Sequence, residues 1–287
     1  MNVMTKTRFE VVPLTQHIGA EIRGIDLREK PDDETVRAIY QAWLDHLVII
    51  FPGQKLSQED LLRATSFFGE NGGLSRPEKY HPAGFSKMLP GIMLISNIRE
   101  NGEPIGALPD GEMMFHHDMI HAEVPSKATL LYSVEIPSSG GNTLFASGYA
   151  AYETFDPAIR ARLEGKHAQH HYNYGSMQRG DDRGVAAFNE FTHPVFRTHE
   201  ETGRKAVYVN RLMTVKVVDM DPTESDVLLK ALFDHAENRE FVYEHVWRKG
   251  DLLLWDNRCS SHARTDFPAD ERRLMLRTTV AGTTRPY

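Results

Sequence analysis

The sequence predicts a mainly β protein, a double-sheet jelly roll with helical insertions. Three observations support this fold class: many short runs of β-branched and aromatic residues, a few stretches with helical apolar spacing, and frequent Gly and Pro at turns. No linker, charge block or internal repeat divides the 287 residues, so we expect residues 1–287 to form one domain.

The first part of the chain combines strand patterns with two capped helices. Short β-branched runs are separated by glycines, and apolar residues then recur every three and four positions behind residues that can cap a helix. The expected elements are strands within 8–27, a helix capped by Asp32 or Asp33, a buried strand at 47–51, and a helix from Ser57 to near Gly69.

Two polar, glycine-containing stretches are predicted to be loops beside a functional site. Residues 72–110 are rich in Gly, Pro and Asn and contain one strand candidate, at 91–98. Residues 168–190 have no hydrophobic period. Long loops in compact domains are often functional, so both stretches are candidate active-site loops.

The remaining elements follow from alternation, turn residues and caps. We expect strands at 113–125, 127–137, 140–147, 193–198 and 205–210, a short helix from Pro157 to Gly165, a helix at about 223–236, a hairpin joining 241–247 to 251–257, and a last strand within 272–282.

Composition narrows the classes of partner and compartment. The net charge of −7 gives no general reason to expect nucleic acid or an anionic membrane surface as a partner. Because no apolar run approaches about 18 residues, no membrane span is expected. The single cysteine, Cys259, excludes an intramolecular disulfide, and we expect a small buried residue there. We therefore expect a cytoplasmic protein, present as a homo-oligomer (dimer or tetramer).

The stretch "FHHD" suggests a metal site. Successive side chains of a strand point to opposite faces, so His116 and Asp118 would share one face while His117 points the other way. Imidazole and carboxylate ligands suit a first-row divalent metal, and two histidines with one carboxylate leave positions open for non-haem Fe(II) chemistry. A third ligand must come from elsewhere, since a lone His-x-Asp is more often a hydrogen-bonded polar pair.

The segment 250–282 supplies further candidates. A buried strand ends in "WDN", His262 follows after a turn, and a later strand carries Arg273 and Arg277. With a period of two, the arginines lie on one face between apolar neighbours. Two cations on one face of a core strand would be costly without anionic partners, so they indicate an anion site.

Together, "FHHD", "GGNTLFA", "WDNRCSSH" and "RRLMLR" resemble motifs of the taurine / 2,4-dichlorophenoxyacetate dioxygenase family of Fe(II)- and 2-oxoglutarate-dependent oxygenases. The opening "PLTQHIGAEIRGIDL" is also similar, so the resemblance covers nearly the whole chain. It implies a double-stranded β-helix core that binds Fe(II) and uses 2-oxoglutarate and O2 as cosubstrates.

The resemblance also implies roles for individual residues. His116, Asp118 and His262 would be the iron ligands, and Thr143 and Arg273 would hold the distal carboxylate of 2-oxoglutarate. Arginine suits this task because its planar fork can grip a carboxylate through two hydrogen bonds.

The substrate expected from the resemblance is a small anionic molecule such as a sulfonate, a phenoxyalkanoate or a similar carboxylate. Arg277 would contact its anionic group or the metal-bound carboxylate of 2-oxoglutarate. Glu112, Phe115 and Met213 depart from the residues of the taurine enzyme, which argues against taurine. His81 and Tyr80 are further candidate substrate contacts.

Two other functional classes stay open at the level of sequence. One is a jelly-roll metalloenzyme of another reaction type, such as a zinc hydrolase, which would turn over without O2. The other is a non-catalytic small-molecule binding protein on the same scaffold, in which His116→Ala would leave function intact.

Overall fold

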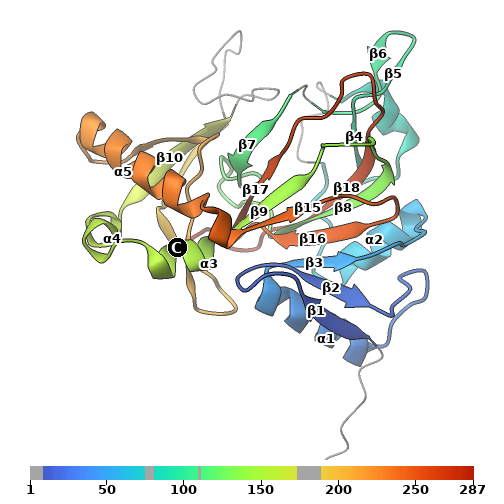
Figure 1. Cartoon of the computed structure of the whole chain (residues 1–287), viewed down its shortest axis with the longest axis horizontal. Coiled ribbons are helices and arrows are strands. Elements are labelled where there is room, and N and C mark those ends of the chain that lie inside the picture. The colour runs from blue at the N-terminus through green and yellow to red at the C-terminus, as the bar shows by residue number, and fades with distance from the viewer. Residues whose placement is uncertain (1–8, 75–80, 109–110, 173–188) are drawn as a thin grey trace, which may run out of the picture.

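Two β-sheets face each other at the centre of the computed structural model, which describes residues 9–74, 81–108, 111–172 and 189–287 (Figure 1). The larger sheet has the order β1-β2-β3-β16-β8-β18-β4 and the smaller sheet β15-β9-β17-β7. The larger sheet contains Glu10–Pro13 (β1), Ala20–Arg23 (β2), Val48–Phe51 (β3), Leu252–Asp256 (β16), Ala128–Glu135 (β8), Leu274–Val280 (β18) and Met93–Ser96 (β4). The smaller sheet contains Val242–His245 (β15), Thr143–Ser147 (β9), Ser260–Arg264 (β17) and Met113–His116 (β7).

The centre of the larger sheet is buried on both faces. On β16, Leu252 and Leu254 join the apolar cluster beneath α1 (Asp33–His46) and α2 (Gln58–Ser66), while Leu253 and Trp255 join the cluster that faces the smaller sheet. This alternation follows from the two-residue period of a strand. The Trp255 ring lies 5.4 Å from that of Phe145 on β9, so side chains from both sheets fill the space between them.

The helices begin at the capping residues that the sequence indicates. Asp32 caps α1, and Ser57 forms a capping box with Asp60 at the start of α2. No helix in the described ranges is long and apolar enough to cross a membrane. The other helices are Ala83–Lys87 (η2), Gly148–Thr154 (α3), Pro157–Leu163 (α4), Pro222–Ala236 (α5) and Arg239–Phe241 (η3).

Small sheets and helices form a second layer beside the smaller sheet (Figure 1). α3 and α5 contribute to an apolar cluster with the strands that surround them. The strands outside the two main sheets are Arg99–Glu100 (β5), Glu103–Pro104 (β6), His167–Tyr172 (β10), Asn189–Pro194 (β11), Phe196–Thr198 (β12), Lys205–Val207 (β13) and Thr214–Val217 (β14).

The predicted hairpin of residues 241–247 and 251–257 is wrong. β15 pairs with β9, whereas β16 pairs with β3 and β8, so the two segments belong to different sheets. The physical reason lies in burial. A strand with apolar residues on both faces needs a neighbour on each side and cover above and below, which a two-stranded hairpin cannot provide.

Two further expectations need correction. The strand predicted at 113–125 stops at His116, because a turn follows in which Met119 has φ of 59° and accepts the backbone N–H of Ala122. The predicted loop 168–190 is a strand over 168–172, where β10 pairs with β11 and β14, and residues 189–190 belong to β11. The remainder of that loop, 173–188, lies outside the described residues.

Histidines on β10 and β11 are buried without an acidic partner among the described contacts. His170 and His193 are both fully buried, with ring centroids 5.8 Å apart. His170 contacts the Thr214 hydroxyl and His193 the Ala122 carbonyl. Burial is the main cause that lowers the pKa of His193 to about 4 and the pKa of His170 well below its ordinary 6.5.

These depressed pKa values predict acid sensitivity. Below pH 6.5 the unfolded chain binds protons that the folded chain does not, so the free energy of unfolding should fall between pH 6.5 and about 4. We expect His193→Gln, which removes one titrating group, to reduce this loss by about 1–3 kcal/mol. Urea denaturation at a series of pH values measures it.

The control is His167→Gln, an exposed histidine on the neighbouring strand β10, which should leave the pH dependence of the wild type in place. If both variants reduced the pH dependence of the free energy of unfolding equally, that dependence would not come from the buried histidine.

Candidate active site

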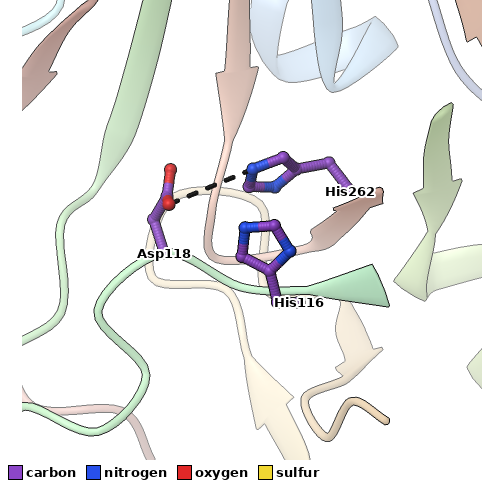
Figure 2. Close-up of side chains that lie close together, drawn as sticks. All are labelled: His116, Asp118 and His262. Carbon is purple, nitrogen blue, oxygen red and sulfur yellow. Dashed lines mark ion pairs between the residues drawn. The ribbon is translucent and has the colours of Figure 1, made fainter. Parts of the chain in front are cut away.

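Three side chains of the metal motif meet between the sheets (Figure 2). His116 is the last residue of β7 and pairs with His262 of β17, so their rings stand side by side with centroids 4.1 Å apart. Asp118 reaches the same point from the turn after β7. One ligand atom from each residue lies within 4.8 Å of the other two, and all three residues are buried.

The hydrogen bond of His116 leaves its second ring nitrogen able to bind a metal. Its Nδ1 lies 2.9 Å from the carbonyl oxygen of Met114. Because a carbonyl only accepts, Nδ1 carries the proton and Nε2 keeps a free lone pair. A backbone carbonyl in this position is the usual partner of a metal-binding imidazole. Burial, the largest effect, lowers the pKa of His116 and lowers that of His262 further, so both rings are neutral at pH 7, as metal binding requires.

Asp118 is the negative group of the site. Its Oδ1 lies 2.9 Å from Nη2 of Arg277 and 4.0 Å from Nε2 of His262, and its Oδ2 accepts a hydrogen bond from Thr129. Burial alone would raise the pKa of Asp118, but the charge of Arg277 and the hydrogen bond from Thr129 lower it below its ordinary value. The donor set is therefore two neutral imidazoles and one carboxylate, which fits a first-row divalent metal.

His117 points away from the other two, as strand alternation predicts. Its Nδ1 accepts a hydrogen bond of 3.2 Å from the side-chain amide of Asn210, and its ring lies against Tyr208. With Nδ1 accepting, Nε2 must carry the proton. Burial lowers the pKa of His117 to about 3, so the ring is a neutral core residue.

A cavity adjoins His116, Asp118 and His262 and has a cationic lining. Thr143, Arg273 and Arg277 all reach it, together with Trp255. Arg273 is only 2% exposed. Among the described residues its Nε has no hydrogen-bond partner, and its Nη2 makes a long contact, of 3.4 Å, with the Gly141 carbonyl. Burial and the neighbouring Arg264 lower the pKa of Arg273 to about 9. An anion beside the guanidinium would therefore stabilise its charged form.

Thr143 is oriented by a buried tryptophan. Its Oγ1 accepts a 3.0 Å hydrogen bond from Nε1 of Trp247. The hydroxyl proton of Thr143 is then available to a second acceptor. Since Thr143 and Arg273 line the same cavity, they can serve one ligand.

Arg264 is a residue of the cavity that sequence reasoning missed. It lies on β17 two positions after His262, pairs in register with Thr143, and is 7% exposed. The missed signal was alternation: had residues 260–264 been predicted as a strand rather than a turn, His262 and Arg264 would have shared one face.

The structure places some of the candidate substrate contacts at the cavity and others away from it. Met213 lines the cavity, while Glu112 is exposed and His81 packs on Phe85, with ring centroids 5.1 Å apart. Among the described residues, neither Glu112 nor His81 belongs to the cavity wall. Tyr80 lies outside the described residues. Within the stretch 72–110, Met93 and Ile95 of β4 line the cavity, as do Ala107 and Leu108.

A second buried group, His199, Asp256 and Cys259, also has the spacing of a metal site. Hydrogen bonding argues against that use. Nδ1 of His199 accepts two backbone N–H groups, so its Nε2 must donate to Asp256. Arg258 donates to both carboxylate oxygens of Asp256. The lone pairs that a cation would need are taken, and the group is a structural network.

Known proteins are similar to this chain in sequence and in fold over nearly their full length. The chain is 30% identical over 285 residues to an (S)-phenoxypropionate/alpha-ketoglutarate-dioxygenase of Sphingobium herbicidovorans, covering 96% of this chain and 95% of that protein. It is 34% identical over 277 residues to a pentalenolactone F synthase of Streptomyces avermitilis, covering 90% and 89%. The crystal structure of a taurine dioxygenase from Burkholderia xenovorans superposes with a TM-score of 0.78 at 31% identity, covering 97% and 92%.

The family model for "Taurine catabolism dioxygenase TauD, TfdA family" matches residues 10–279. This match confirms the resemblance seen in the motifs. The chain therefore belongs to the TauD, TfdA family of dioxygenases.

Proposed function

We propose that this chain is an Fe(II)- and 2-oxoglutarate-dependent dioxygenase that oxidises a small anionic organic substrate and releases succinate and CO2. The observation that carries the proposal is the convergence of His116, Asp118 and His262 beside a buried, cationic cavity. We further propose that residues 1–287 act as one catalytic domain and that the two facing sheets are the double-stranded β-helix core of the family.

The protein's part in this reaction is to hold the reactants. His116, Asp118 and His262 would hold Fe(II), which supplies O2 activation coupled to the decarboxylation of 2-oxoglutarate. All three residues line the cavity, so a metal that they held would have further coordination positions for other ligands there. Apolar side chains such as Trp255 and Leu131 line part of that cavity and would help a bound substrate to displace water from it.

The distal carboxylate of 2-oxoglutarate would lie between Thr143, Arg264 and Arg273. Thr143 and Arg264 are register partners on β9 and β17, and Arg273 is close enough to Arg264 for their charges to interact. Arg273 offers unsatisfied donors, and Thr143 offers its hydroxyl proton. A carboxylate between them would offset the like-charge repulsion of these two neighbouring buried arginines.

Arg277 would contact the anionic group of the substrate or the metal-bound carboxylate of 2-oxoglutarate. It lines the cavity, and its Nη2 is bound to Asp118. The guanidinium has further donors that this one contact leaves available. Methionines at 93, 113 and 213 line the same cavity, so an apolar substrate body beside an anionic head fits the lining.

Removing one ligand tests the metal site. We expect His116→Ala to bind Fe(II) more than about tenfold more weakly and to form no succinate, because only two ligands remain. His117→Gln is the matched control and should keep both properties, since His117 bonds to Asn210 instead. Anaerobic titration with Fe(II) and 2-oxoglutarate, followed by the visible charge-transfer band, measures binding.

The proposal fails if the wild-type protein shows no such band, if zinc supports turnover without O2, or if His116→Ala retains full activity.

Two adjacent arginines allow a controlled test of the cosubstrate site. We expect Arg273→Ala to raise KM for 2-oxoglutarate about 10- to 100-fold, because a charge-assisted pair is lost. Arg272→Ala should change it little, since Arg272 is exposed and pairs with Glu135. Succinate release against 2-oxoglutarate concentration gives both values, and equal KM values for the two variants would exclude the assigned role.

The substrate's charge is best tested on the substrate, because Arg277 also binds Asp118. Sulfonates, phenoxyalkanoates, sulfate esters and carboxylated amines should be screened for stimulated succinate release. For each one that stimulates release, we expect the uncharged ester or amide analogue to be about 30-fold poorer or worse in kcat/KM. A neutral analogue that is equally active would refute an anion-binding role for Arg277.

A further inference from the structure

A chain of buried hydrogen bonds runs from the larger sheet to Asp118. Nε1 of Trp255 donates to Oδ1 of Asn257 at 2.9 Å, and Nδ2 of Asn257 donates to Oγ1 of Thr129, also at 2.9 Å. The Thr129 hydroxyl then donates to Oδ2 of Asp118 at 2.7 Å. Asn257 and Thr129 are both 0% exposed, so bulk water cannot replace these bonds.

The hydrogen bonds of this chain can be donated in only one direction, from Trp255 toward Asp118. The indole N–H can only donate, so the amide oxygen of Asn257 must face Trp255. The amide nitrogen of Asn257 then faces Thr129 and donates to it. Thr129 has a single hydroxyl proton and must give it to the carboxylate of Asp118, which only accepts. Each donor and acceptor in the chain therefore determines the next.

Asp118 depends on these hydrogen bonds because of its position in the fold. Asp118 lies in the turn beyond β7, so no strand pairing holds it, and the next residue, Met119, has a positive φ of 59°. Thr129 lies on β8, and Asn257 directly follows β16, both in the larger sheet. The larger sheet thus anchors a residue whose two fellow ligands stand on the smaller sheet.

The anchor also selects the carboxylate oxygen that faces the metal site. Thr129 binds Oδ2, and Oδ1 is left facing His262 at 4.0 Å and Arg277 at 2.9 Å. Because the Thr129 bond occupies one lone pair of Oδ2, it favours Oδ1 as the oxygen that faces a cation.

We propose that Thr129 and Asn257 are positioning residues that hold Asp118 with Oδ1 toward the metal, and that Trp255 sets the direction of the chain. The inference rests on the proposed function, because it assumes that Asp118 is a ligand. Partners of this kind, behind a metal ligand, typically change metal affinity 10- to 100-fold when they are removed.

The test measures metal affinity without turnover. Mn(II) is titrated into the metal-free protein, and the visible spectrum of the Co(II)-loaded protein reports ligand geometry. We expect Thr129→Val, which keeps the side-chain shape and removes the hydroxyl, to weaken Mn(II) binding about 10- to 100-fold and to shift the Co(II) spectrum. Thr129→Ser restores the hydroxyl and should restore both.

Asn257→Asp tests the direction of the chain. An aspartate at 257 would accept the Thr129 proton, turning the hydroxyl away from Asp118, so we expect a loss of affinity similar to that of Thr129→Val. This variant also carries the test if Thr129→Val does not fold.

Thr65→Val is the matched control, since Thr65 is a buried threonine that bonds to Leu61 and Thr278, away from the site. It should lower thermal stability but leave Mn(II) affinity unchanged.

Wild-type affinity in Thr129→Val or Asn257→Asp would overturn the inference, as would equal losses in Thr129→Val and Thr129→Ser. The outcome of these metal-binding measurements does not depend on whether the protein catalyses the proposed reaction. A protein that binds Mn(II) through Asp118 and Thr129 but forms no succinate would refute the proposed function and leave this inference standing.

Discussion

The antiparallel register between β7 and β17 is the constraint on which the site depends. It places His116 opposite His262. β17 also pairs with β9, and that register places Arg264 opposite Thr143. A slip of one residue would turn every one of these side chains to the other face of its sheet. The apolar contacts between the sheets, such as Phe145 against Trp255, hold the register because only one pairing buries them.

Electrostatics follows from that geometry. Among the described residues that line the cavity, Arg264, Arg273 and Arg277 are accompanied by one carboxylate, that of Asp118. Charges held in a buried space are weakly screened, so the cavity favours anions of the size that it can enclose. The neutral state of His116 and His262 adds no further positive charge and keeps their lone pairs for a cation. One buried space can thus accept both a metal ion and anionic organic molecules.

Some parts of the fold were predictable because local chemistry determines them. The caps at Asp32 and Ser57 fix helix starts, and the apolar runs of β3 and β8 could only be buried strands. β17 was missed because "SSHAR" has no apolar alternation: its cavity-lining residues are the polar His262 and Arg264. The hairpin of 241–257 was wrong because adjacency in sequence does not reveal which strands need neighbours on both sides.

The sequence by itself determined the chemistry of the site: two imidazoles, one carboxylate and two spaced arginines, in an order that identifies the family. Only the tertiary structure decided how they meet. Asp118 reaches the ligand site from a turn and is held by Thr129, which lies on another sheet. The reason is physical. Residue spacing limits which side chains can share a face, but a donor atom is directed by register, turns and hydrogen bonds from distant segments.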